Sequence, residues 1–154
     1  MENQNQNQNQ SSENDSKNRI EKWDELPIEE NLLRGIYAYG FDEPSEIQKK
    51  AILPVIEKRD VIAQAQSGCG KTGSFSIAAL QRLDMTKKTP QVLILSPTHE
   101  LVKQTADVVE GLGNFMDNLQ VKTLIGGTSI RDDVHSLEEK APQIIVGTVG
   151  RVLD

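Results

Sequence analysis

Residues 65–72 read AQSGCGKT, and they join an apolar run at residues 60–65 (DVIAQA) to an amphipathic stretch at residues 71–83 (KTGSFSIAALQRL). A glycine-rich loop between a strand and a helix is the setting of a phosphate-binding loop. Gly68 and Gly70 allow backbone conformations that turn successive N–H groups toward an anion, and the following helix adds the positive end of its dipole. The segment therefore predicts an α/β fold built around a phosphate site.

Several positions of this loop have a chemical role in nucleotide binding. The ammonium group of Lys71 would reach the outer phosphates, and the hydroxyl group of Thr72 would be a ligand of Mg²⁺. The generic pattern begins with glycine where this chain has Ala65, so the variant AxxGxGKT is the one that fits in full. Cys69 is interpreted as a small residue in a variable position, with redox sensing as the alternative. We expect ATP and Mg²⁺ as cofactors, contacted here by Ala65, Gln66, Ser67, Gly68, Cys69, Gly70, Lys71 and Thr72.

Short apolar runs alternate with longer amphipathic stretches after residue 58, an alternation that is typical of βαβ units. It predicts a parallel sheet of about four strands, covered by helices on both faces. Strands are expected at residues 60–65, 91–96, 120–125 and 143–147, and helices at residues 31–39, 45–57, 71–83, 99–116 and 130–139. Ser45 is a predicted N-cap, Thr128 or Ser129 is another, and Pro54 is expected to kink or end its helix.

Composition limits the classes of protein to which the chain can belong. Its 154 residues suffice for one domain, and its net charge of −6 argues against a general nucleic-acid-binding surface. A single cysteine excludes a disulfide framework, and no apolar run is long enough to predict a membrane span. Residues 1–18 are rich in Asn and Gln and carry almost no apolar side chains, so this tail is predicted to be disordered rather than a signal peptide.

Four further segments complete a resemblance to the DEAD-box RNA helicases, which use the AxxGxGKT form of the loop. Residues 40–48 (GFDEPSEIQ) resemble the Q motif of that family, and residues 97–104 (PTHELVKQ) are similar to its PTREL segment. The doublet at residues 126–127 matches its GG motif, and residues 148–151 (TVGR) are similar to TPGR. The resemblance covers residues 23–154, and the phrase LLRGIYAYGF is similar to the initiation factor 4A subgroup.

The resemblance implies a RecA-like P-loop NTPase fold with an incomplete sheet. Residues 19–57 would form the helical Q-motif region, and residues 58–154 would form a truncated ATP-binding domain. Gln48 would hydrogen-bond the adenine edge, since an amide offers a donor and an acceptor side by side. Phe41 would pack on the adenine ring. Trp23 is equally compatible with adenine contact and with a place in the core.

The resemblance also implies contact with the sugar–phosphate backbone of RNA, which carries no sequence code. Two departures from the family pattern fall on this side of the chain. His99 replaces an arginine and lacks its guanidinium fork, and Val149 replaces a proline that would fix its turn. RNA contact is therefore expected to be weakened, while the ATP motifs are intact. The RNA-binding positions that match are Thr98, Gly127, Thr148, Gly150 and Arg151.

The DEAD and SAT segments and the second domain of the family do not occur within these 154 residues. Phosphoryl transfer needs a metal, a positioned water molecule and positive charge together, so we expect little or no hydrolysis and no unwinding from this polypeptide alone. A catalytically inactive module that binds nucleotide or a protein partner is an alternative, and a degenerate remnant is another. The subgroup resemblance implies translation initiation proteins as partners and a cytoplasmic location.

Overall fold

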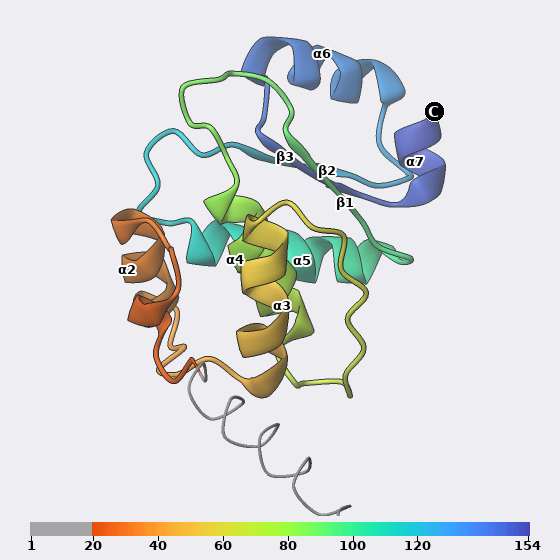
Figure 1. Ribbon diagram of the computed structural model, residues 1–154. Helices are drawn as coiled ribbons and strands as arrows, with labels where there is room; N and C mark the ends of the chain where they lie inside the picture. The colour runs from red at the N-terminus through yellow and green to blue at the C-terminus, as the bar shows by residue number, and fades with distance from the viewer. Residues whose placement is uncertain (1–19) are drawn as a thin grey trace, which may run out of the picture.

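The computed structural model describes residues 20–154, so the predicted disordered tail at residues 1–18 lies outside the described residues. Figure 1 shows a small sheet with α4 and α5 on one side and α6 on the other. The helices and strands, in chain order, are η1 (Trp23–Glu25), α2 (Glu30–Ala38), α3 (Glu46–Ile56), α4 (Lys71–Gln81), β1 (Val92–Leu95), α5 (His99–Leu112), β2 (Val121–Leu124), α6 (Ile130–Lys140), β3 (Ile144–Gly147) and α7 (Val149–Leu153).

The sheet has three parallel strands in the order β1-β3-β2. Val92 of β1 and Val121 of β2 both align with Ile144 of β3, so all three carboxyl ends lie at one edge. The central strand is the most apolar, and its Ile144 and Val146 are fully buried. The predicted α/β class and parallel sheet are therefore confirmed, and the loops that follow β1, β2 and β3 all leave the carboxyl edge.

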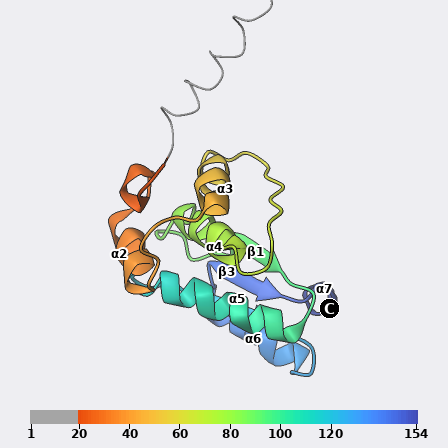
Figure 2. The same ribbon diagram turned by 90° about the horizontal axis from the view of Figure 1, so that it is seen from below.

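The predicted strand at residues 60–65 is wrong, and the sheet has three strands rather than about four. Residues 60–65 have no regular structure, and no backbone–backbone hydrogen bond within residues 20–154 involves them. Figures 1 and 2 both show the chain between α3 and α4 as a loop that runs apart from the sheet. An apolar run becomes a strand only where a neighbouring strand accepts its hydrogen bonds, and this run has none beside it.

The predicted helices exist, with changed ends. α5 ends at Leu112 rather than at residue 116 because Gly113 forms its C-cap, and α4 ends at Gln81 rather than at residue 83. Pro54 lies inside α3, which continues to Ile56. Ser129, not Thr128, caps α6, which continues to Lys140. The predicted capping role of Ser45 is confirmed by a reciprocal capping box with Gln48.

One hydrophobic core joins the N-terminal helices to the rest of the chain. It brings Trp23, Leu32 and Ile36 together with residues of α3, α4, α5 and β3. Gly35 allows a close approach of α2 to α5, because a Cβ atom there would lie 1.9 Å from the carbonyl oxygen of Leu112. The N-terminal helices between residues 23 and 56 are therefore packed onto the helices that flank the sheet. No helix within residues 20–154 has the length and apolar character needed to cross a membrane.

Candidate functional site

The phosphate loop has the backbone that its glycines predict. Gly68 and Gly70 adopt positive φ angles of 82° and 91°, which favour glycine, and Gly70 is the N-cap residue of α4. Lys71 and Thr72 open that helix, so the free N–H groups of its first turn lie beside their side chains. The ammonium group of Lys71 donates to the carbonyl oxygen of Ala65 and spans the loop from one end to the other.

The start of α3 holds this loop from the other side. The hydroxyl group of Ser45 donates to the carbonyl oxygen of Cys69 at 3.0 Å, and the Gln48 amide donates to that of Gly70 at 3.4 Å. The amide oxygen of Gln48 accepts from the backbone N–H of Ser45 at 2.8 Å. Gln48 is buried, and these hydrogen bonds place its side chain against the loop. Nothing in the pattern alone indicated that Ser45 also contacts the loop.

Phe41 reaches the same place from the end of α2. A Cβ atom added to Gly73 would lie 2.9 Å from the Phe41 ring and 2.8 Å from the Gln48 amide nitrogen, so both side chains converge on the first turns of α4. Trp23 is fully buried, stacks on Phe41 with ring centres 6.4 Å apart, and donates its indole N–H to the Phe41 carbonyl oxygen at 2.9 Å. The geometry therefore favours the core interpretation of Trp23, as the residue that holds Phe41.

A cavity of about 380 Å³ lies between α3, α4 and the loop that joins them. Of the predicted nucleotide residues, Lys71 and Thr72 border it, and the other lining side chains are mainly apolar. No cluster of three or more His, Cys, Asp or Glu side chains within residues 20–154 could hold a metal ion by itself.

The predicted RNA-contact residues lie at the carboxyl edge of the sheet. Thr98 follows β1 and caps α5, accepting a hydrogen bond from the Leu101 N–H at 3.2 Å. Gly127 follows β2 with a φ angle of 91°. The imidazole of His99 lies against the same loop, 3.5 Å from the position of a Cβ atom on Gly126. Thr148 follows β3 as the N-cap residue of α7, so the structure brings the three loops to one edge.

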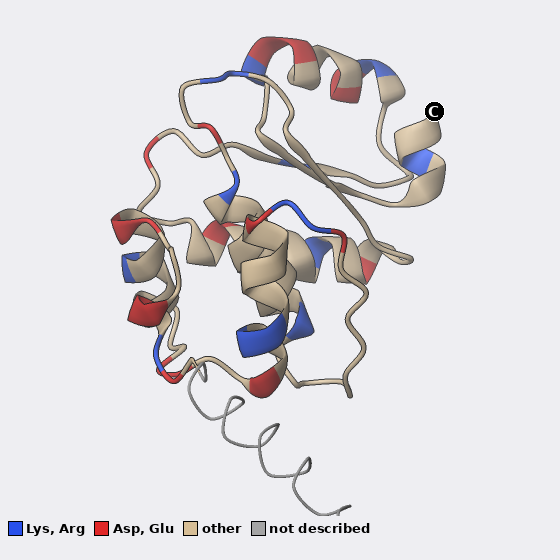
Figure 3. Cartoon of the chain, viewed as in Figure 1, with Lys and Arg blue, Asp and Glu red and all other residues tan. Residues whose placement is uncertain are grey.

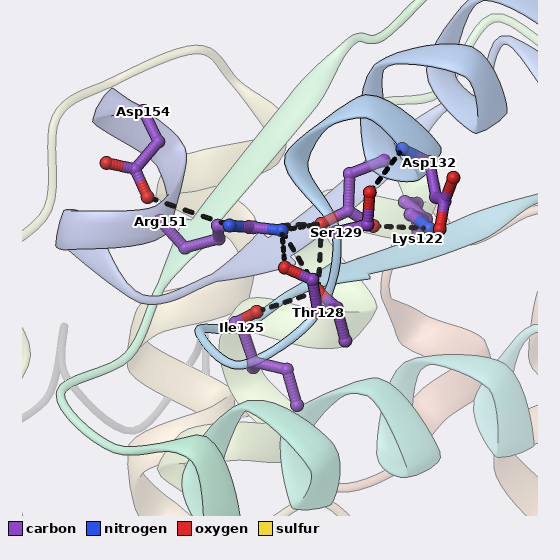
Figure 4. Close-up of polar contacts among 8 residues, drawn as sticks. Lys122, Ile125, Thr128, Ser129, Asp132, Arg151 and Asp154 are labelled. Atoms are coloured by element: carbon purple, nitrogen blue, oxygen red, sulfur yellow. Dashed lines mark hydrogen bonds and ion pairs between the residues drawn. The ribbon is translucent and has the colours of Figure 1, made fainter.

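Arg151 is at this edge but its side chain points into the protein. Only 6% of it is exposed, and it forms an ion pair with Asp133 of α6 at 2.9 Å. Figure 4 shows the guanidinium group directed at the loop that carries Thr128. Lys122 of β2 forms a second ion pair with Asp133 at 3.0 Å. Burial would raise the pKa of Asp133, but the hydrogen bonds from Lys122 and Arg151 outweigh it and lower that pKa below its ordinary value.

Charged side chains elsewhere are mixed in sign. Figure 3 shows Lys and Arg interspersed with Asp and Glu over the helices, with no single basic face in that view. Sequence patterns missed Asp133 and Lys122, because a carboxylate in a surface helix and a lysine in a strand carry no motif. Gly73 could have been found, since glycine inside a helix usually has a packing reason.

Comparison with known proteins identifies relatives over nearly the whole chain. The DEAD/DEAH box helicase family matches residues 45–154. The chain is 55% identical to ATP-dependent RNA helicase eIF4A of Chaetomium globosum and 58% identical to that of Eremothecium gossypii, in both cases over 135 residues. These matches cover 88% of this chain and 34% of each relative, so the chain spans about a third of their length.

Solved structures agree with the sequence matches. A DEAD box protein from the hyperthermophile Methanococcus jannaschii superposes with a TM-score of 0.82 at 35% identity, covering 88% of this chain and 37% of that one. Dbp5 of S. cerevisiae, bound to RNA and ADP BeF3, superposes with a TM-score of 0.74 at 38% identity, covering 86% of this chain and 33% of that one. With five motifs in order, the matched fold and these relatives, the chain belongs to the DEAD/DEAH box helicase family.

Proposed function

We propose that this chain is the ATP-binding part of an RNA helicase similar to eIF4A. The observation that carries the proposal is the convergence of Phe41 and Gln48 on the helix that begins with Lys71 and Thr72. An adenine-binding aromatic and amide would thus stand beside a loop whose glycines already have phosphate-binding geometry. The names of the relatives, which are ATP-dependent RNA helicases, support the same activity for the complete protein.

Each residue of the loop has a defined task in this proposal. Backbone N–H groups from Gln66 to Thr72 donate to phosphate oxygens, and the positive end of the α4 dipole favours the negative charge of the phosphates. Lys71 exchanges its carbonyl partner at Ala65 for a phosphate oxygen, a stronger acceptor because it is charged. The Thr72 hydroxyl is the protein ligand for Mg²⁺, which supplies charge neutralisation between phosphates when bound. Gln48 would then exchange the hydrogen bond that its amide donates to the Gly70 carbonyl oxygen for hydrogen bonds to the adenine edge.

RNA would be held through its backbone at the carboxyl edge of the sheet. The proposed contacts come from Thr98, Gly127, Thr148 and Gly150, with Arg151 at the same edge. Such contacts read phosphate and sugar and carry no sequence code. His99 and Val149 replace the arginine and proline of the family pattern, so these contacts are proposed to be weak. Translation initiation proteins as partners and a cytoplasmic location complete the proposal by similarity to eIF4A.

Thermal unfolding with and without Mg-ATP tests the proposal. A ligand that binds only the folded chain at 100 times its Kd adds about 2.7 kcal/mol to the free energy of unfolding. The wild type should show a nucleotide-dependent rise in Tm that Lys71→Ala abolishes. Lys50→Ala is the matched control, because Lys50 is exposed on α3, and it should keep the shift. A wild-type chain that unfolds cooperatively but shows no shift with ATP would contradict the proposal.

A further inference from the structure

The Nε and Nη2 donors of Arg151 are committed inside the protein. Its Nε and Nη2 atoms donate to one carboxylate oxygen of Asp133 at 3.1 and 2.9 Å. Nη2 also donates to the carbonyl oxygen of Thr128 at 2.7 Å and lies 3.1 Å from the Thr128 hydroxyl oxygen. Nη1 lies 3.7 Å from a carboxylate oxygen of Asp154. A phosphate could take the Nε and Nη2 donors only by displacing these partners, at the expense of a largely buried ion pair.

Asp133 joins β2, the loop that follows β2, and α7. It receives Arg151 from α7, Lys122 from β2 at 3.0 Å, and the Thr128 hydroxyl group at 3.2 Å. Only 13% of its side chain is exposed. We call Lys122, Thr128, Asp133 and Arg151 the Asp133 cluster. Its two cations face one largely buried carboxylate, so losing the carboxylate would remove the ion-pair partner of Lys122 and the nearer ion-pair partner of Arg151.

The Asp133 cluster fixes the loop that Gly127 occupies. Thr128 is held at three points: its carbonyl oxygen and its hydroxyl oxygen accept from Arg151, and its hydroxyl group also contacts Asp133. The Thr128 hydroxyl group lies 3.2 Å from the Ile125 carbonyl oxygen, which closes the turn. Gly127 itself has a positive φ angle and open space around its Cα atom. Contacts on the inner side of the loop thus hold its backbone, while its outer face at Gly127 is open to solvent.

We propose that Asp133 is a positioning residue for RNA, which holds Arg151 and Thr128 so that the Gly127 loop presents its backbone to the phosphates. Arg151 then acts through the loop and through α7 rather than as a phosphate ligand. The inference rests on the proposed RNA contact at this edge. It assigns a role to Asp133, which belongs to no sequence motif. It also changes the role of Arg151 from a direct RNA contact to a residue that holds the loop.

The direction in which Asp133→Asn changes RNA affinity distinguishes the two possible roles of Arg151. If Arg151 binds phosphate directly, Asp133→Asn removes a competing carboxylate and strengthens RNA binding. If Asp133 positions the loop, Asp133→Asn weakens binding, although it removes a negative charge that repels RNA. The measurement is fluorescence anisotropy of a labelled oligouridylate titrated with the full chain at low salt. We expect Asp133→Asn to weaken binding on the order of tenfold, the loss of one charge-assisted hydrogen bond.

Two variants accompany this measurement. Asp132→Asn is the matched control, since Asp132 is the neighbouring exposed carboxylate on α6, and its substitution should leave binding equal or slightly stronger. Asp133→Glu keeps the charge and should recover part of the affinity. Hydrogen exchange of residues 125–129 in the free chain gives a readout without RNA, and exchange should be faster in Asp133→Asn than in Asp132→Asn.

The outcomes distinguish this inference from the proposed function. A wild-type chain that does not bind RNA would overturn the proposed RNA contact and the positioning role with it, while faster exchange in Asp133→Asn would still support the hold on the loop. A wild type that binds, with Asp133→Asn binding equally or more tightly, would overturn the positioning role alone. Unchanged exchange at residues 125–129 would overturn the claim that Asp133 holds the loop.

Discussion

The two ends of the proposed site are built in opposite ways. The phosphate loop has the intact motif, yet residues 60–65 that lead into it lack regular structure, and Ile62 is fully exposed. The RNA edge has the departures from the family pattern, yet its loops are tied together by the Asp133 cluster, whose Arg151 side chain is 6% exposed. Motif agreement and structural support are therefore independent properties of this chain. Ligand binding at the first end and folding stability at the second should respond differently to substitution.

Of the substitutions within the two ends of the proposed site, one at the RNA edge should cost the most stability. Arg151→Met leaves Asp133 largely buried with Lys122 as its remaining cation, and removes the donors to Thr128. The free energy of unfolding should fall by about 2–3 kcal/mol, measured by urea denaturation. Arg131→Met on the exposed face of α6 is the control and should change it by less than about 0.5 kcal/mol. Equal effects of the two variants would mean that the cluster adds no stability.

At the nucleotide end, a glycine substitution should change ligand affinity more than stability. Gly73→Ala places a Cβ atom against Phe41 and Gln48, so we expect ATP affinity to fall about tenfold, which is 1.4 kcal/mol. Gly150→Ala is the matched variant, because Gly150 is also helical but has open space around it. It should keep ATP affinity and gain up to about 1 kcal/mol of stability from helix propensity. Both are measured by ATP titration and urea denaturation.

The contrast explains how far sequence reasoning reached. Local sequence patterns predicted β1, β2, β3 and the helices between them, because strands and helices alternate along the chain as in βαβ units. The apolar run at 60–65 satisfied the same local rule and failed, since a strand needs a partner that no local window contains. Ser45 and Gly70 were predictable from capping and turn chemistry. The role of Asp133 was not predictable, because it depends on contacts with β2 and α7 that exist only in the folded chain.

The pH dependence of folding stability is a further test of the Asp133 cluster at the RNA edge. The pKa of Asp133 is lowered in the folded chain, with Lys122 and Arg151 outweighing the effect of burial. A lowered folded pKa contributes stability that is present above the unfolded pKa and is lost as the pH falls through the folded pKa. Urea denaturation of the wild type should therefore show stability that falls as the pH drops below about 4, the ordinary pKa of an aspartate. Asp133→Asn should lose part of that slope, and Asp132→Asn should retain it.

The smallest expected effect tests the region where sequence and structure disagree. Ile62→Ala should change the free energy of unfolding by less than about 0.5 kcal/mol, because Ile62 buries nothing within residues 20–154. Ile144→Ala in the central strand is the matched substitution and should cost about 2–5 kcal/mol, since Ile144 is fully buried. If Ile62→Ala also cost more than about 2 kcal/mol, residues 60–65 would be packed in solution as the sequence pattern predicted. The phosphate loop would then have a rigid support, and the contrast between its two ends would disappear.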